Sequence, residues 1–225
     1  MSLVIALKSV SGDVVLASDQ LGTIGDPSGL VCTDEAQEKL LIFKTGAVAM
    51  VGDIGHLAIP VHEALAKIDR DGSEPLTTII DTVRTHFNAH WSNKKVKEEC
   101  INRPEASLVF ADVRNGLTRI CSLTSERDFG PSVHSLSLAV QGVYNYAFYL
   151  RKRLFRNDMT IDEITRLAIF SIYETGLVEP KVGKEPVVVK IMCSGSIVRM
   201  SKAEIDHIIK ENNQRYANFA TELFR

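Results

Sequence analysis

The sequence lacks any long apolar run. No stretch reaches the roughly 18 consecutive apolar residues that a membrane-spanning helix needs. The first residues do not combine a charged segment, an apolar segment and a small-residue cleavage site. The four cysteines, Cys32, Cys100, Cys121 and Cys193, are far apart and include no Cys-x-x-Cys pair. These absences predict a soluble, cytoplasmic protein with reduced thiols and no membrane association.

An excess of positive charge is also missing. The chain has 26 lysine and arginine residues against 28 aspartate and glutamate residues, which gives a formal net charge of −2. Proteins that bind nucleic acid use clustered cations to displace counterions from the phosphates. The near balance of charge therefore predicts no nucleic-acid partner.

The common catalytic and cofactor-binding motifs are absent as well. There is no Gly-x-Ser-x-Gly turn, no His-Glu-x-x-His and no Gly-x-Gly-x-x-Gly after a strand. Gly183 and Lys184 are followed by Glu185, where a phosphate-binding loop needs Ser or Thr. His86 and His90 have the spacing of a metal pair on one helix face, but no third ligand accompanies them, which favours surface histidines. We therefore expect no metal and no cofactor.

The chain does contain a regular order of hairpins and helix pairs. Short apolar runs joined by turn residues predict strands at residues 3–7, 14–17, 39–43, 47–51, 106–113, 117–123, 136–140, 187–192 and 196–200. Apolar residues at helical spacing predict helices at residues 57–68, after Pro75, at 143–155, from Thr160 to about Gly176, and after Ser201. Residues 22–34, rich in Gly, Pro, Ser and Asp, predict a loop.

This order predicts the fold class. Hairpins imply antiparallel sheets, and helices that arrive in pairs imply layers packed on those sheets. We therefore predict an α+β fold in which two antiparallel sheets lie between two helical layers, a four-layer αββα sandwich. Residues 1–225 are expected to form one such domain.

The candidate chemistry lies at the start of the chain. Ser2 follows the initiator Met, whose removal would give Ser2 both a hydroxyl and a free α-amine. An α-amine with a pKa of about 7.7–8.0 can take the hydroxyl proton near neutral pH, so one residue would supply nucleophile and base. Asp19 ends the second strand and Lys39 begins the third, and both ends can lie near Ser2 in a sheet. Taken alone, Asp19 and Lys39 equally fit a structural ion pair.

Four segments carry a resemblance to a known family. They are residues 2–8 (Ser-Leu-Val-Ile-Ala-Leu-Lys), 14–19 (Val-Val-Leu-Ala-Ser-Asp), 37–43 (Gln-Glu-Lys-Leu-Leu-Ile-Phe) and 49–53 (Ala-Met-Val-Gly-Asp). Together they resemble the proteasome β-type subunits of the N-terminal-nucleophile hydrolase superfamily. The resemblance extends to the bacterial proteasome-like peptidase that works with an ATP-driven unfoldase and to the ancestral β-subunit proteins.

The resemblance implies roles for four residues. Ser2 matches the nucleophile, Asp19 and Lys39 match the catalytic Asp and Lys, and Gly52 matches the glycine whose N–H lines the oxyanion hole. The sequence departs from the family in using Ser rather than Thr as nucleophile. It also has Ala-Val-Gln-Gly at residues 139–142, where the family has Gly-Ser-Gly, and no clear match for the family's later Asp and Ser near residues 176–179.

Two functions follow from the resemblance. The first is a hydrolase of threonine-peptidase type that cleaves peptide or other amide bonds in a peptide or protein substrate through Ser2. The alternative is a catalytically inactive structural subunit of a proteasome-like assembly. The resemblance further implies a homo-oligomer, ring-like in shape, and an ATP-driven unfoldase as a partner.

Overall fold

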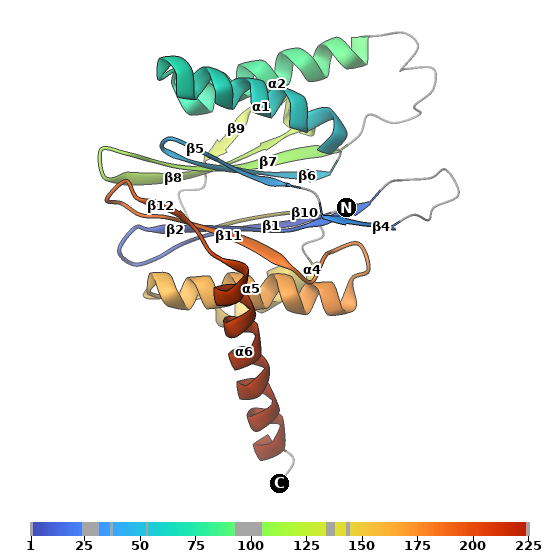
Figure 1. Ribbon diagram of the computed structural model, residues 1–225, viewed down its shortest axis with the longest axis vertical. Helices are drawn as coiled ribbons and strands as arrows, with labels where there is room; N and C mark the ends of the chain where they lie inside the picture. Colours follow the sequence, from blue (N-terminus) through green and yellow to red (C-terminus); the bar gives the residue numbers. More distant parts are fainter. Residues whose placement is uncertain are drawn as a thin grey trace.

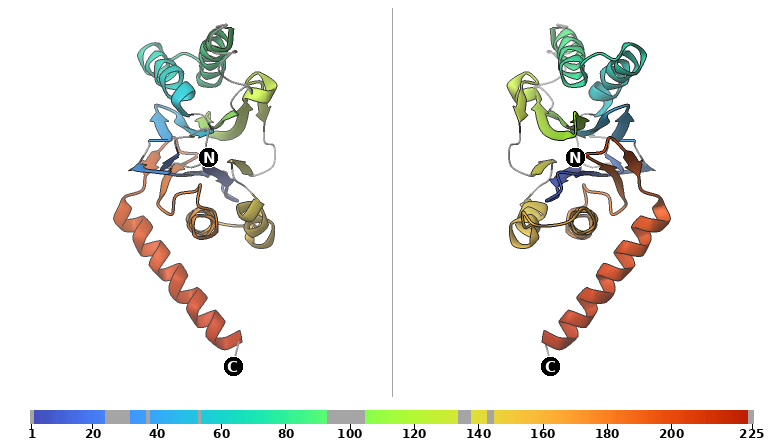
Figure 2. Two further views of the ribbon diagram at one scale, coloured as in Figure 1. Left: turned by 90° about the vertical axis from the view of Figure 1, so that its right-hand side faces the viewer. Right: turned by 90° about the vertical axis from the view of Figure 1, so that its left-hand side faces the viewer.

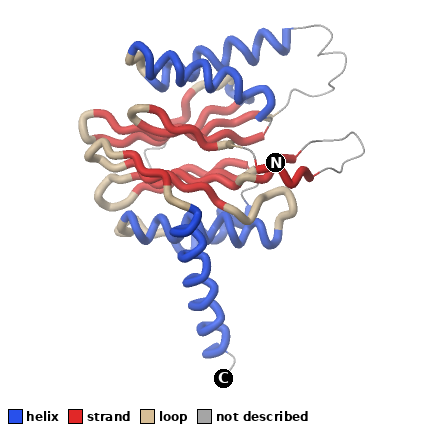
Figure 3. Tube along the Cα trace, viewed as in Figure 1, coloured by secondary structure: helices blue, strands red, loops and turns tan. Residues whose placement is uncertain are grey.

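Four layers of secondary structure make up the molecule. The computed structural model describes residues 2–23, 32–36, 38–52, 54–92, 105–133, 138–142 and 145–223. Two five-stranded antiparallel sheets lie face to face. Helices α1 (Ile54–Asp71) and α2 (Pro75–Ser92) cover one outer face, and α4 (Asn145–Leu154) and α5 (Ile161–Val178) cover the other (Figure 1). The predicted αββα sandwich is confirmed, and Figure 3 separates its two sheets from its two helical layers.

The sheet that carries the start of the chain has the strand order β10-β1-β2-β11-β12. Its strands are β1 (Leu3–Lys8), β2 (Val14–Asp19), β10 (Leu138–Gly142), β11 (Pro186–Ile191) and β12 (Ile197–Arg199). β1 and β2 are nearly unbroken buried runs because helices cover one face of this sheet and the second sheet covers the other. β1 lies between β2 and β10, and its first residue, Leu3, pairs with Gly142.

The second sheet has the order β5-β6-β7-β8-β9. Its strands are β5 (Leu40–Phe43), β6 (Gly46–Gly52), β7 (Ala106–Arg114), β8 (Leu117–Thr124) and β9 (Pro131–Val133), with a short 3-10 helix, η1 (Ser125–Arg127), between the last two. Asn115 and Gly116 both have positive φ, at 51° and 73°, as a two-residue hairpin turn requires. The hairpin predicted from this Asn-Gly pair is therefore present.

Alternation along the strands divides the core into three clusters. Met50, Leu108 and Phe110 pack towards α1 and α2, whereas Leu3, Ile5 and Leu7 pack towards α4 and α5. The third cluster fills the space between the two sheets. Its members include Val4, Ala6, Val14, Leu16, Ala47, Ala49, Val109, Ala111 and Ile120. Strand residues of one parity therefore face the other sheet, and those of the opposite parity face helices.

Capping boxes begin two of the helices. The Thr160 hydroxyl accepts a hydrogen bond from the Glu163 N–H, and the Glu163 carboxylate accepts one from the Thr160 N–H at 2.8 Å, as predicted for α5. Ser201 and Glu204 make the same pair of bonds before α6 (Lys202–Leu223). α6 packs on α5 near Ile205 and then extends away from the sandwich (Figure 2).

Several sequence expectations need correction. The stretch predicted as a loop at residues 22–34 includes parts of two short paired strands, β3 (Leu21–Thr23) and β4 (Cys32–Ala36). The sequence pattern does not predict β3, β4 or β9. β3 and β9 have three residues each, which is too few to show alternation. β4 has the polar sequence Cys-Thr-Asp-Glu-Ala, which is typical of a loop. β10 begins at Leu138, and residues 134–137 and 143–144, part of a predicted strand and a predicted helix, lie outside the described residues.

The described helices fall short of what a membrane span requires. Each is either too short or too polar to cross a bilayer.

Candidate active site

Ser2 lies where the space between the two sheets opens at one end. It immediately precedes β1, is 2% exposed, and lines a cavity of about 640 Å³. The ends of β6, β7, β8 and β10 form the other walls of this cavity, and Gly52 and Gly142 are among them. A side chain at this position borders a volume that can hold a substrate group.

Asp19 lies at the end of β2, one strand away from Ser2. Its Oδ1 accepts a hydrogen bond from the N–H of Leu3, the residue that follows Ser2, at 2.9 Å. Its Oδ2 accepts from the N–H groups of Leu21 at 3.1 Å and Gly183 at 3.0 Å, and from Lys39 Nζ at 2.9 Å. Four donors therefore fix this fully buried carboxylate, and one of them ties it to the start of β1.

Lys39 precedes β5 and is as buried as its partner. Its ammonium group donates to Asp19 and to the Leu21 carbonyl. Burial lowers the pKa of Lys39 below the usual lysine value, and the Asp19 carboxylate opposes this shift without cancelling it. The side chain can therefore give up a proton more readily than an exposed lysine. Asp19 thus binds the N–H that follows Ser2 and also pairs with Lys39, but among the described residues neither hydrogen bond of Lys39 goes to Ser2.

Two glycines that line the same cavity as Ser2 lie at places where no side chain fits. Gly52 has a φ of +87°, and a Cβ there would lie 2.1 Å from the Glu105 carbonyl oxygen. Gly142 has a φ of +100°, and its Cβ would lie 1.8 Å from the carbonyl oxygen of Ser2. Gly142 therefore lets β10 approach Ser2 closely.

We expect Gly142→Ala to be strongly destabilising. The new methyl group would overlap the Ser2 backbone and force β1 and β10 apart, in addition to the cost of positive φ. Gly72→Ala is the matched control, because Gly72 has a φ of +69° with open space around it. Gly72→Ala should cost about 1 kcal/mol, and Gly142→Ala at least about 2 kcal/mol more, in urea unfolding. Equal losses for the two variants would contradict the close approach.

Gly142 and Gly183 are site residues that sequence reasoning did not single out. Gly142 ends the stretch at residues 139–142 that departs from the family pattern, and Gly183 lies shortly before the predicted strand at residues 187–192. The Gly183 N–H reaches Asp19 because Asp19 pairs with Pro186 across β2 and β11, which brings the preceding loop to the carboxylate. The sequence signal for Gly183 was a glycine shortly before a predicted strand. Such a glycine does not show which residue its N–H binds.

The two histidines considered as a metal pair have other partners. His86 Nε2 lies 2.7 Å from a carboxylate oxygen of Glu63, and the His90 ring lies 4.0 Å from the His56 ring, measured between centroids. Within the described ranges, no group of three or more His, Cys, Asp or Glu side chains is placed to hold a metal ion.

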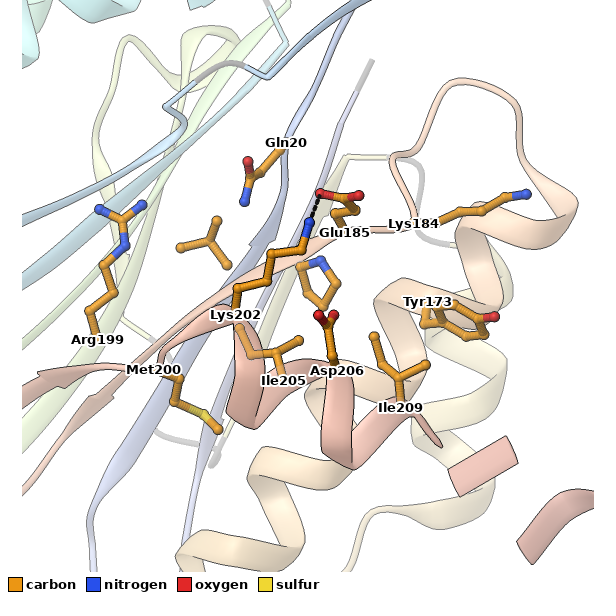
Figure 4. A pocket seen from close by; sticks show the side chains of 12 residues that line it. Gln20, Tyr173, Lys184, Glu185, Arg199, Met200, Lys202, Ile205, Asp206 and Ile209 are labelled. Carbon is orange, nitrogen blue, oxygen red and sulfur yellow. Dashed lines mark hydrogen bonds and ion pairs between the residues drawn. The ribbon is translucent and has the colours of Figure 1, made fainter. Parts of the chain in front are cut away.

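A second cavity, of about 530 Å³, lies between β11, β12 and the first turns of α6 (Figure 4). Gln20 and Lys184, which line it, directly follow Asp19 and Gly183 in the chain. Lys202 and Glu185 form an ion pair of 3.3 Å at its edge. Its lining includes no Ser, Thr, Cys or His, so among the described cavities the one beside Ser2 is the better candidate for covalent chemistry.

Comparison with known proteins finds similarity in structure alone. No protein-family model and no curated protein matches the chain. Anbu (ancestral beta-subunit) from Yersinia bercovieri superposes with a TM-score of 0.75 at 15% identity, covering 97% of this chain and 96% of that one. An Anbu (Gly-1) mutant from Hyphomicrobium sp. strain MC1 superposes with a TM-score of 0.69 at 13% identity, with both chains fully covered. At this level of identity the likeness shows the fold, and the chain has the four-layer fold of the ancestral β-subunit proteins.

Proposed function

We propose that the protein is an N-terminal-nucleophile hydrolase that cleaves peptide or other amide bonds through Ser2. One observation carries the proposal: Ser2 lines a cavity beside Gly52, while Asp19 binds the N–H of the next residue and holds Lys39. The Anbu-like fold supports the same function.

In the proposed reaction, Ser2 supplies both the nucleophile and the base. The Ser2 oxygen attacks the substrate carbonyl carbon, and the free α-amine of Ser2 takes the hydroxyl proton. The amide C–N bond then breaks, the leaving amine takes that proton, and the acyl group remains on Ser2 as an ester. Water attacks the ester, gives a proton to the Ser2 oxygen by way of the amine, and releases the carboxylic acid. The Gly52 N–H would donate to the oxyanion, and the Lys39 charge would lower the pKa of the amine.

The proposal requires that Ser2 be the first residue of the active chain. We expect protein that begins at Ser2 to react with a peptide boronate or β-lactone at Ser2, and protein that retains Met1 to remain unmodified, because an amide nitrogen cannot act as the base. Intact mass before and after treatment measures both states. Equal modification of the two forms, or no modification of the Ser2 form between pH 6 and 9, would contradict the proposal.

A structural subunit without catalytic activity is the second candidate. Within the described residues, the two hydrogen bonds of Lys39 go to Asp19 and the Leu21 carbonyl, which is the arrangement of an ion pair that stabilises the sheet. The N-terminal labelling experiment separates the two functions, since a structural subunit that begins at Ser2 has no reason to react.

We further propose that the protein forms a ring-like homo-oligomer, and the outer helices support this. Phe148 and Tyr149 on α4 are 42% and 54% exposed, and Leu177 and Val178 at the end of α5 are 49% and 62% exposed. Exposed aromatic and aliphatic side chains on neighbouring helices are typical of an interface. We expect sedimentation at micromolar concentration to give a multiple of the 24.9 kDa chain mass, and Tyr149→Ser with Leu177→Ser to lower it. A monomer in both cases would contradict the proposal.

A further inference from the structure

The space between the sheets changes character along its length. Over most of the interface, inward-facing residues of the second sheet are apolar, as at Val109, Ala111 and Ile120. Continuing the same alternation towards Ser2 brings Ser107 on β7 and then Ser122 and Thr124 on β8 to the same face. All three line the cavity beside Ser2. The core therefore becomes polar at the end where the candidate nucleophile lies.

These hydroxyl groups form one continuous surface. Ser107 lies directly opposite Thr124 in the β7–β8 ladder, and Ser122 lies opposite Ser132 in the β8–β9 ladder. Directly opposed residues in antiparallel strands have side chains in contact range. Across the cavity, the first sheet contributes Gln141, again an uncharged hydrogen-bonding side chain.

Within this hydroxyl surface, Thr124 stands out by its hydrogen bonding. Its Oγ1 is buried and has no hydrogen-bond partner within the described part of the chain. Thr124 occupies the N-cap position of η1, yet its side chain makes no capping bond. A buried hydroxyl without a partner lowers the stability of the folded chain. Rotation about χ1 exchanges the positions of the hydroxyl and the methyl group of Thr124. The hydroxyl of this cavity-lining residue can therefore turn towards a ligand.

The charged residues of the cavity narrow the choice of ligand. Glu105, Glu126 and Arg127 are exposed, and Arg127 donates to the Ser132 hydroxyl at 2.8 Å. Arg127 thus reaches the hydroxyl surface at Ser132, whereas Ser107, Ser122 and Thr124 themselves carry no charge. An apolar group there would remove polar atoms from water without replacing their hydrogen bonds, and a charged group would lack a buried partner.

We propose that the cavity beside Ser2 selects an uncharged hydrogen-bonding side chain of the substrate, with asparagine and glutamine as the best fit, and that Thr124 determines this specificity. The inference rests on the proposed hydrolase function, since it assigns the cavity to a peptide substrate. Asparagine against leucine is the matched comparison, because the two side chains are similar in size and shape and differ in hydrogen bonding.

Binding to the Ser2→Ala protein tests the inference without requiring catalysis. The probes are fluorescein-labelled pentapeptides that differ only in asparagine or leucine at one position, with each position tested in turn. At one position we expect the asparagine peptide to bind about tenfold more tightly, as the loss of one or two hydrogen bonds implies. Adding Thr124→Val should reduce this preference severalfold and leave the melting temperature unchanged or higher.

Thr45→Val is the matched control, because Thr45 Oγ1 is also buried without a partner in the described residues but lies outside the cavity. It should keep the melting temperature and leave the preference intact. Equal binding of the two peptides, tighter binding of leucine, no binding at all, or the same effect from both threonine variants would overturn the inference. If asparagine is preferred while wild-type Ser2 remains unreactive towards a boronate, the cavity assignment stands and the hydrolase function fails.

Discussion

Lys39→Ala should abolish the reaction of Ser2 with a peptide boronate and reduce amide hydrolysis by about 10³-fold or more, as Ser2→Ala should. The two changes have similar effects because nucleophile, base and neighbouring charge act as a unit. Without the Lys39 charge, the pKa of the α-amine rises and residual activity should move to higher pH. Asp19→Asn should have a smaller effect, since Lys39 stays in place but is poorly held.

Lys8→Ala is the control for this prediction. Lys8 lies at the other end of β1 and donates to the Thr118 carbonyl, away from Asp19. It should retain activity within about twofold. Rates of probe uptake and of peptide hydrolysis, measured on chains that begin at Ser2 and have native circular dichroism, give the comparison. If Lys39→Ala changes only stability and not reactivity, Asp19 and Lys39 are a structural ion pair.

Asp19→Ala should destabilise the protein by about 3–5 kcal/mol. The change leaves the Lys39 ammonium buried without its counter-ion, and the N–H groups of Leu3, Leu21 and Gly183 without their acceptor. Urea unfolding of the two proteins measures the difference in free energy.

A double variant separates the two causes of that loss. Asp19→Ala with Lys39→Met removes both charges, so it should be more stable than Asp19→Ala alone by about 1 kcal/mol or more. The remaining deficit reports the unpaired N–H groups. A double variant no more stable than the single one would mean that the buried ammonium contributes little to the loss.

The sequence allows the sandwich to be predicted because its strands are distinct. Buried strands such as β1 and β2 are nearly unbroken apolar runs, and the Asn115-Gly116 turn predicts its hairpin unambiguously. The closeness of Asp19 to Lys39 can also be predicted from the sequence, because both residues lie at strand ends.

The rest of the site depends on contacts between distant residues. The Gly183 N–H reaches Asp19 only because β11 pairs with β2, and Gly142 approaches Ser2 only because β10 pairs with β1. The hydroxyl surface at Ser107 and Thr124 depends on the register of β7 against β8. Such pairings are set by the whole fold, and no local pattern in the sequence indicates them.

The position of β1 fixes an order of events during biosynthesis. Leu3 pairs with Gly142, more than half the chain away, so β1 is enclosed only after most of the protein has been synthesised. In the folded chain Ser2 is 2% exposed. Under the proposed function, which needs a free amine on Ser2, the growing chain offers an interval before this pairing in which the preceding residue can be removed.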